Sequence, residues 1–403
     1  MLSLLSCGSN AQGQLGNGTR DDSQRFLPCS FADHSPGSLP PGTKTILKVA
    51  TGANHTMVLL ELSGGDKEIW GCGDGRKGQL GSAYQQNASA TTFQKLDLSL
   101  ELSGQEQHSF EIIGATWETS YVVLSCGGGG PDMVLAMGSN EFGDLGAGTL
   151  KGKTKFNNIF LEDITGMYTG QRHIVLRLGT SKLIGWGSSR HGQLGDTASK
   201  PVASFPSMIS LPSIIEDPIR SISLGMQHTV ILFESGRLYS LGSNRKHQLD
   251  VVGAPLCHVL SLACTWNGTY VAFKDDHKEG SWEVCSSGNN SHSQLGRSVD
   301  ESTIGGVSFP SSLDTQNSAV SIHCGSEHVL ALVEDCEIWG WGWNEHGNLG
   351  VGHTDDVPLP TKIWPPEGPA HSHSFKVHGS WGGLGTSWIC VEMPDEDGKS
   401  KAL

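Results

Sequence analysis

Residues 337–350, EIWGWGWNEHGNLG, contain the pattern that organises the whole chain. The stretch contains three tryptophans at period two, Trp339, Trp341 and Trp343. In an extended strand such residues share one face, and the glycines between them leave the other face almost bare. Gly342 and Asn344 then favour a tight turn, because glycine adopts positive φ and asparagine side chains bond to nearby backbone. The stretch therefore predicts a closely packed strand followed by a turn.

The frame Gly-x-Asn followed five residues later by Leu recurs along the chain, with Gly or Ser replacing Asn in two copies. The copies are Gly8/Asn10/Leu15, Gly73/Gly75/Leu80, Gly138/Asn140/Leu145, Gly187/Ser189/Leu194, Gly242/Asn244/Leu249, Gly288/Asn290/Leu295 and Gly342/Asn344/Leu349. Their leucines are 46 to 65 residues apart. Repeats of this length are typical of propeller blades, and seven copies predict a seven-bladed ring.

Composition supports an all-β protein. Glycine accounts for 54 of the 403 residues, and only 17% of residues are charged. Many glycines and few helix-favouring charged residues are typical of short strands joined by tight turns. The sequence therefore predicts an all-β fold, a seven-bladed β-propeller.

The two ends of the chain predict how the ring closes. The chain begins with a strand, Leu2–Cys7, that has no preceding partner, and a second such strand, Ser387–Glu392, lies near its end. Pairing these two strands completes the seventh hairpin and removes an exposed sheet edge. We therefore expect residues 1–393 to form the propeller and residues 394–403 to form a charged, disordered tail.

Each unit also contains a small residue, two further residues and a His before an apolar strand, as in Gly52-Ala-Asn-His55. Similar copies place His173, His228 and His328, whereas alignment of the other units puts Trp117, Trp266 and Gly385 at this position. One His per blade is spread around a ring, so we interpret it as a turn residue whose ring nitrogen bonds a nearby backbone group. His371 and His373 would bind a metal only with partners that the sequence does not show. No metal site and no cofactor is predicted.

The segments between the repeats are polar or rich in Ser, Pro and Gly, and are predicted to be solvated connections. They are residues 17–48, 82–111, 197–220, 300–319 and 354–376.

Charge and cysteine content restrict the function. The net charge is −14 and no basic run occurs, which argues against direct nucleic-acid binding. The ten cysteines include no CxxC pair, and Cys7, Cys72 and Cys285 fall in predicted strands, so reduced, buried thiols of an intracellular protein are expected. No apolar run approaches 18 residues, so we expect no membrane span and a cytoplasmic protein, with the nucleus as a further location.

The frame GSNAQGQLG at residues 8–16, together with the Gly-x-x-His element, resembles the regulator of chromosome condensation repeat. The resemblance covers essentially the whole chain and implies a seven-bladed propeller. Members of that family include nucleotide-exchange factors, ubiquitin-ligase modules, photoreceptors and scaffolds, so the fold alone does not set the function.

A narrower resemblance is to the branch that contains the fungal α-tubulin suppressor and killer-toxin-insensitivity proteins. It rests on MLSLLSCGSNAQGQLG, the units around Trp117 and Trp266, SHSQLG, GSEHVLAL with WGWGWNEHGNLG, and GGLGTSWICV. This branch implies a heterodimer with the small zinc-ribbon protein of diphthamide synthesis, with the zinc held by the partner. It further implies a supporting role in diphthamide formation and, through Elongator, in tRNA wobble-uridine modification. Longer loops and Asp250 in place of a glycine depart from the branch pattern.

Candidate partner-binding residues depart from or extend the general repeat within these matched segments. They are Trp117, Trp266, Trp343, Asn344, Glu345 and His346. The alternative for the tryptophans is packing between blades, and for the other residues turn formation.

The leading hypothesis is a non-enzymatic scaffold, since no nucleophile-elbow, zinc-helix or phosphate-loop motif occurs. The main alternative is a guanine-nucleotide exchange factor for a Ran-like small GTPase, although the basic N-terminal arm of chromatin-bound exchange factors is not expected here. A tryptophan-based light sensor is a further alternative. Trp186, Trp339 and Trp341, however, occupy predicted positions in the blade core.

Overall fold

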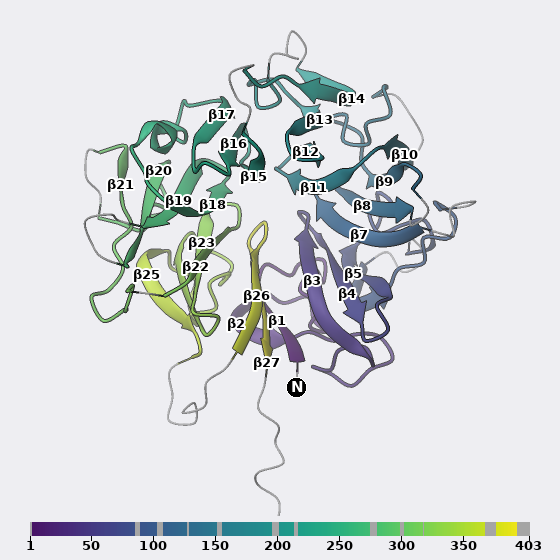
Figure 1. The fold of residues 1–403 in the computed structure, drawn as a ribbon. Helices are drawn as coiled ribbons and strands as arrows, with labels where there is room; N and C mark the ends of the chain where they lie inside the picture. Colours follow the sequence, from purple (N-terminus) through teal and green to yellow (C-terminus); the bar gives the residue numbers. More distant parts are fainter. Residues whose placement is uncertain are drawn as a thin grey trace, which may run out of the picture.

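The computed structural model describes residues 2–84, 89–102, 108–126, 129–150, 155–195, 201–212, 217–274, 280–298, 302–316, 318–366 and 376–392. Seven antiparallel sheets are arranged in a ring around a central axis (Figure 1). This confirms the predicted all-β, seven-bladed propeller. In the part of the chain that the structure describes, no helix is long and apolar enough to cross a membrane.

The blades are numbered from the first complete sheet. Blade 1 contains β3 (Thr43–Thr51), β4 (His55–Leu62), β5 (Lys67–Asp74) and β6 (Ser89–Lys95). Blade 2 contains β7 (His108–Ala115), β8 (Thr119–Cys126), β9 (Asp132–Gly138) and β10 (Phe156–Leu161). Blade 3 contains β11 (Ile164–Thr169), β12 (His173–Leu178), β13 (Lys182–Ser188) and β14 (Val202–Ile209). Blade 4 contains β15 (Ile219–Leu224), β16 (His228–Phe233) and β17 (Leu238–Gly242).

Blade 5 contains β18 (Val259–Thr265), β19 (Gly268–Lys274), β20 (Trp282–Gly288) and β21 (Ile304–Gly306). Blade 6 contains β22 (Val320–Cys324), β23 (His328–Val333), β24 (Glu337–Gly342) and β25 (Val357–Trp364). Blade 7 contains β26 (Lys376–Gly382), β27 (Thr386–Glu392), β1 (Leu2–Gly8) and β2 (Ser23–Pro28).

Blade 7 closes the ring as predicted. Strands β1 and β27 pair without a register shift from Leu2 opposite Glu392 to Gly8 opposite Thr386. Both strands are therefore interior strands of one sheet, flanked by β2 and β26. The predicted propeller boundary at residue 393 and the tail at residues 394–403 lie outside the described residues.

The hydrophobic core is divided among the junctions between neighbouring blades. Each of the seven buried clusters in the described residues combines side chains from two adjacent blades. Trp186 and Trp341 are fully buried and Trp339 is 8% exposed, which confirms their predicted core positions. Cys7, Cys72 and Cys285 are buried in strands as predicted, and all ten cysteines are free. Stability in such a ring depends on every junction being occupied.

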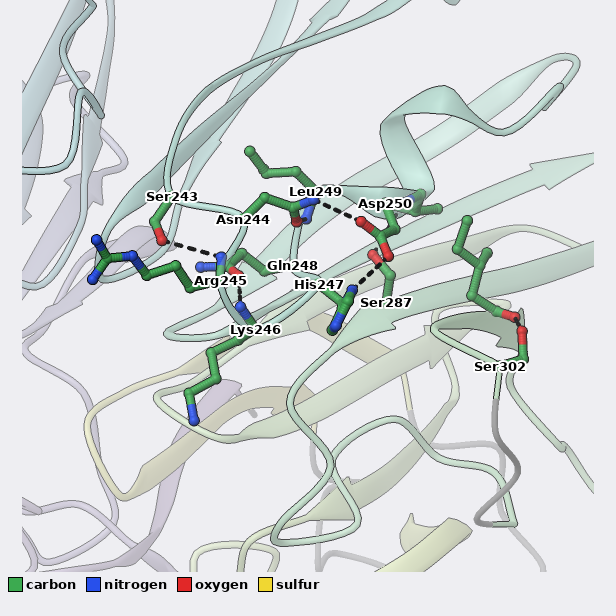
Figure 2. A network of polar contacts seen from close by, with 12 residues as sticks. Ser243, Asn244, Arg245, Lys246, His247, Gln248, Leu249, Asp250, Ser287 and Ser302 are labelled. Atoms are coloured by element: carbon green, nitrogen blue, oxygen red, sulfur yellow. Dashed lines mark hydrogen bonds and ion pairs between the residues drawn. The ribbon is translucent and has the colours of Figure 1, made fainter.

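The Gly-x-Asn frame forms a compact turn that is closed from within (Figure 2). In blade 4, Asn244 Oδ1 accepts a hydrogen bond from the Leu249 N–H at 2.8 Å, and Gln248 Oε1 accepts one from the Lys246 N–H at 2.8 Å. The same asparagine bond forms at Asn10, Asn140, Asn290 and Asn344. The frame therefore has a structural role, which explains why it recurs regardless of function.

Asp250, the residue that departs from the repeat, is held within this turn (Figure 2). Its carboxylate accepts hydrogen bonds from Asn244 Nδ2 at 2.7 Å and pairs with His247 Nδ1 at 3.0 Å. Asp250 also begins a 3₁₀ turn, Asp250–Gly253, at the place where the other blades continue towards a fourth strand.

The sequence predicted two strands per unit, and the structure adds an inner strand to each blade and an outer strand to all but blade 4. The outer strands β2, β6, β14, β21 and β25 lie in segments that were predicted to be solvated connections. That prediction was wrong because an outer strand has neighbours on one edge only and is largely solvated. Strand β2, for example, buries only its first residue and so lacks a clear alternating pattern.

The predicted row of three tryptophans on one strand face is correct only for Trp339 and Trp341. Strand β24 ends at Gly342, whose φ of +99° turns the chain, so Trp343 lies in the following turn and is half-buried.

The four repeated histidines are buried where neighbouring blades meet. Their Nε2 atoms bond hydroxyl groups of the next blade: His55 to Ser120 at 2.9 Å, His173 to Thr229 at 3.5 Å, His228 to Thr269 at 3.3 Å and His328 to Ser387 at 2.9 Å. The predicted backbone partner is correct only in part, because the backbone of Gly268 bonds His228 and that of Thr386 bonds His328. All four histidines also bond a hydroxyl side chain of another blade, which no pattern within one unit reveals. These histidines link blades.

We expect the free energy of unfolding to fall as the pH is lowered from about 6.5 towards 4. Burial lowers the pKa of His55, His228 and His328 to about 4 and that of His173 to about 3, below the 6.5 of a free imidazole. The folded state therefore binds fewer protons than the unfolded state in this pH window, and stability is fully present only above it. Each histidine contributes up to about 1.4 kcal/mol per pH unit.

Urea unfolding of the parent and of His55→Asn at pH 7.5, 6.5 and 5.5 measures this dependence. The asparagine variant should lose less stability between pH 6.5 and 5.5. It lacks one histidine that binds a proton in the unfolded state but not in the folded state, and all other titrating groups are unchanged. Identical pH slopes for the two proteins would contradict the linkage.

Candidate interaction face

In each blade, two turns lie on the same side of the ring. One joins the first strand to the second, and the other follows the third strand. We call this side the turn face. The pairing within blades shows this: His55, which begins β4, lies opposite Gly73, which belongs to the frame after β5. All six candidate partner-binding residues belong to turns on this face.

Strand pairing corrects the predicted position of two tryptophans. In blades 2, 5 and 7, the frame glycine pairs with Thr119, Gly268 and Thr386. Trp117 and Trp266 therefore lie two residues before the histidine position, within the turn, and the prediction that they replace histidine was wrong. In the unit of Trp117, the small residue that was taken to start the Gly-x-x-His element is Gly114. This residue lies inside strand β7 and not in the turn.

The backbones of Trp117 and Trp266 are fixed by the neighbouring blades. The Trp117 N–H donates to Gln171 O at 2.9 Å, and its carbonyl accepts from the Ala53 N–H at 2.9 Å. The Trp266 N–H donates to Ser326 O at 2.7 Å, and its carbonyl accepts from the Met226 N–H at 3.0 Å. Each tryptophan is thus anchored on both sides.

The two indole rings meet over the central axis. Blades 2 and 5 lie on opposite sides of the ring (Figure 1), yet the ring centroids of Trp117 and Trp266 are only 5.9 Å apart, with an interplanar angle of 37°. Contact between opposite blades requires the rings to extend across the mouth of the channel. Both side chains are half-buried, so the pair also presents an aromatic surface to solvent.

A small polar hollow of about 200 Å³ lies beside Trp117. Arg172 covers the ring of Phe142 at 3.8 Å and lies 5.7 Å from the centroid of Trp117. Asp144 borders the same hollow, and its burial raises the pKa of the carboxyl group to about 7. Asp144 occupies the position that is Gln in most frames, which is the one sequence signal that could have revealed it.

Trp343 and His346 form a second aromatic group on the turn face. Their ring centroids are 5.4 Å apart and nearly perpendicular at 87°, and both approach Gly385 of blade 7. His346 Nδ1 pairs with Asp22 Oδ2 at 2.7 Å. Glu345 is exposed, whereas Asn344 is fully buried and closes the turn. Asn344 therefore presents no side-chain surface to a partner.

Glu327 connects the two aromatic groups. Its carboxylate accepts hydrogen bonds from Asn267 Nδ2 at 2.7 Å and Gln294 Nε2 at 2.8 Å, and its carbonyl accepts from the Trp343 N–H at 3.0 Å. Burial raises the pKa of this carboxyl group. Asn267 is the next residue after Trp266. Glu327 therefore fixes the chain next to Trp266 through its side chain and the Trp343 backbone through its carbonyl group. We call Trp117, Trp266, Trp343, His346 and Arg172 the aromatic site.

A basic group also lies on this face of an otherwise acidic protein. Arg190 and Arg245 are both exposed and lie close enough to His191 to lower its pKa, after the larger effect of desolvation. Lys246 is exposed next to Arg245, and both side chains extend away from the closed turn (Figure 2). The sequence did not reveal this group, because its members come from two blades and form no basic run.

Within the described ranges, no group of three or more His, Cys, Asp or Glu side chains is arranged to hold a metal ion. His371 and His373 lie outside the described residues.

Comparison with known proteins finds a known repeat in parts of the chain. A model of the regulator of chromosome condensation (RCC1) repeat matches residues 3–59, 283–332 and 335–381, and a second RCC1 repeat model matches residues 319–348. The matches therefore cover blades at both ends of the chain, and the seven frames extend the same pattern through the middle.

Curated relatives align along most of the chain. The secretion-regulating guanine nucleotide exchange factor of Mus musculus is 27% identical over 90% of this chain and 79% of that protein. An RCC1 repeat-containing protein of Schizosaccharomyces pombe is 26% identical over 96% of this chain and 99% of that protein. The ultraviolet-B receptor UVR8 of Arabidopsis thaliana is 27% identical over 80% of this chain and 70% of that protein.

Among solved structures, human WBSCR16 superimposes with a TM-score of 0.76 and 18% identity over 97% of this chain and 99% of that chain. This likeness supports the fold. The names of these relatives do not mention the α-tubulin suppressor branch, so the resemblance to that branch remains a prediction.

Proposed function

We propose that this seven-bladed propeller, which matches the RCC1 repeat in its first and last blades, is a non-enzymatic interaction protein that binds a protein partner on its turn face. The observation that carries this proposal is the pair Trp117 and Trp266. Both tryptophans are partly exposed, and both backbones are held on two sides by neighbouring blades. Rigid aromatic anchors of this kind contribute much of the binding energy at protein interfaces, since little side-chain freedom is lost on binding.

The neighbouring charges support the same location. Arg172 lies between Phe142 and Trp117, and the basic group of Arg190, Arg245 and Lys246 lies on the same face. In a protein of net charge −14, this basic group would orient an approaching partner whose surface is acidic.

The relatives support a small GTPase as this partner, with the chain promoting nucleotide exchange. Two relatives, from mouse and Bos taurus, are named secretion-regulating guanine nucleotide exchange factors. A third, from Saccharomyces cerevisiae, is named guanine nucleotide exchange factor SRM1 and is 25% identical over 67% of this chain. Exchange requires no catalytic constellation, because a scaffold that binds the nucleotide-free GTPase more tightly than the nucleotide-bound form favours nucleotide release.

A second candidate partner is the small zinc-ribbon protein of diphthamide synthesis, through which the chain would support diphthamide formation and Elongator-dependent wobble-uridine modification. One observation favours it: segments that carry the resemblance to the α-tubulin suppressor branch converge on the aromatic site. Trp117, Trp266 and Trp343 come from blades 2, 5 and 6, and Gly385 of the GGLGTSWICV segment lies against Trp343. In this case the zinc belongs to the partner, and the propeller needs no cofactor of its own.

Size-exclusion chromatography and calorimetry with each candidate distinguish the two. The zinc-ribbon protein should form a one-to-one complex if the second candidate is correct. A Ran-like GTPase should release bound fluorescent nucleotide faster if the first is correct. Failure of both proteins to bind or respond at micromolar concentration, with every component folded, would contradict both candidates.

Whichever partner binds, Trp266→Ala should weaken binding by about 2 kcal/mol or more, roughly thirtyfold in Kd, because it removes a central aromatic anchor. Calorimetric titration of the responding partner measures the change. Phe160→Ala is the matched control, since Phe160 is a 50% exposed aromatic residue on the outer strand of blade 2. Equal affinities for the two variants would place the interface elsewhere. A shortened segment 82–111 would not serve as a second control for binding. That segment contains β6 and the start of β7, so shortening it would disturb the fold of blades 1 and 2.

A further inference from the structure

The central channel contains a cavity of about 480 Å³ to which all seven innermost strands contribute. At the turn face the cavity reaches Trp266, whose ring lies against Trp117. The aromatic pair therefore covers one end of the cavity. A partner bound to the outer surface of these rings would not contact the cavity below them, so the cavity needs a separate explanation.

The cavity has an unusual charge. Lys48 lines it, and no residue in the described part of the lining is Asp or Glu. A register shift between Ile46 and Lys48 in strand β3 makes Leu47 an extra residue at this point and so sets the direction of Lys48. No hydrogen bond or ion pair to another described residue satisfies the Lys48 ammonium group. Its side chain is accessible within the channel, yet the surrounding blades remove it from bulk water and lower its pKa by desolvation.

Two other polar groups line the same cavity. His323 of blade 6 also lines the cavity; burial, and after it the nearby Lys48, lower its pKa to about 4, so its ring is neutral at pH 7. Its Nε2 pairs with the Ser321 hydroxyl at 3.1 Å, which leaves Nδ1 as the ring nitrogen that can bond a ligand. Ser261 of blade 5 accepts a hydrogen bond from the Ile322 N–H at 3.0 Å, which leaves the hydrogen of its hydroxyl group available to donate. A cation with no opposite charge beside it in the channel is less favourable than one in bulk water, and a bound anion that accepts hydrogen bonds from these groups reduces that cost.

We propose that the central channel is a binding site for a small oxyanion with the chemistry of phosphate, held by Lys48 with His323 and the Ser261 hydroxyl. A cavity of about 480 Å³ admits an anion larger than one phosphate group, so inorganic phosphate and pyrophosphate are the two probes to compare. This site is separate from the proposed partner surface, and its occupancy does not depend on which partner binds there.

The test is calorimetric titration of the full chain with inorganic phosphate and, separately, with pyrophosphate in a buffer without other oxyanions. Lys48→Met should weaken binding by roughly tenfold or more, because it removes a charge-assisted contact while keeping the length of the side chain. Lys44→Met is the matched control. Lys44 lies on the same strand but is exposed and pairs with Glu61 at 3.0 Å, so binding should be unchanged.

The thermal midpoint, Tm, is a second measurement, and it shows whether the Lys48→Met variant is still folded. Phosphate should raise the Tm of the parent and of Lys44→Met but not that of Lys48→Met, whose Tm without anion should be no lower than the parent's. Tighter binding of pyrophosphate would indicate a ligand with linked phosphate groups, and tighter binding of phosphate a free ion. Absence of binding by the parent at millimolar concentration, or equal binding by Lys48→Met, would overturn the proposal.

Discussion

Deletion of residues 387–403 is expected to lower the thermal unfolding midpoint by roughly 10 °C or more, or to prevent folding altogether. The deletion removes all but the first residue of β27, which is an interior strand of blade 7. Trp388 and Cys390 belong to the core between blades 7 and 1, whereas Ile389 and Val391 belong to the core between blades 6 and 7. One strand therefore fills two junctions, and its loss also exposes the edges of β1 and β26.

Deletion of residues 394–403 is the control, because it leaves β27 intact. This variant should unfold within a few degrees of the parent in differential scanning calorimetry. If the longer deletion leaves the midpoint unchanged, closure of the ring by the chain ends does not stabilise the fold.

Replacement of Trp341 with alanine is expected to lower the free energy of unfolding by about 3 to 5 kcal/mol. Trp341 is fully buried in strand β24 and packs against blade 5, with ring centroids 5.6 Å from Phe309 and 6.4 Å from Tyr270. Its Nε1–H donates to Gln294 O at 3.0 Å. Alanine would leave a cavity at the junction and remove one of the two hydrogen bonds that Gln294 O accepts, the other coming from the Tyr270 hydroxyl at 2.6 Å.

Trp343→Ala is the matched control, because Trp343 lies two residues later but is half-buried in the turn. Chemical denaturation should show a smaller loss for this variant, and partner binding should be affected more than stability. An unchanged denaturation midpoint for Trp341→Ala would contradict its assignment to the core.

Most of the global fold could be predicted from the sequence, because the information repeats. In the five frames that have Asn, the turn is specified by a bond between residues five apart, and the spacing of Gly and Leu repeats in all seven, so local sequence was sufficient to count the blades. The pairing of the strands that begin at Leu2 and end at Glu392 also followed, since two unpaired strands in a repeat fold have each other as partners. The buried positions of Trp186 and Trp341 followed from their place before the frame glycine.

The candidate site was predicted less completely. The sequence singled out Trp117 and Trp266 as unusual but assigned them to the wrong position, because spacing within one unit does not fix which residue pairs with the frame glycine. The sequence also did not predict that the two rings meet, since their blades are on opposite sides of the ring and their distance depends on the diameter of the channel. The hydroxyl partners of the four histidines lie in neighbouring blades. The sequence pattern within one repeat therefore could not predict them either.

The sequence by itself therefore determined the repeat, the number of blades, the closing strands and the core tryptophans, since these depend on turns and alternation between nearby residues. Only the tertiary structure decided what lies between blades: the histidine links, the aromatic pair over the channel and the position of Lys48 inside it. The physical reason is that these features depend on how closely blades approach across the ring. That approach is set by the side chains that fill all seven junctions together.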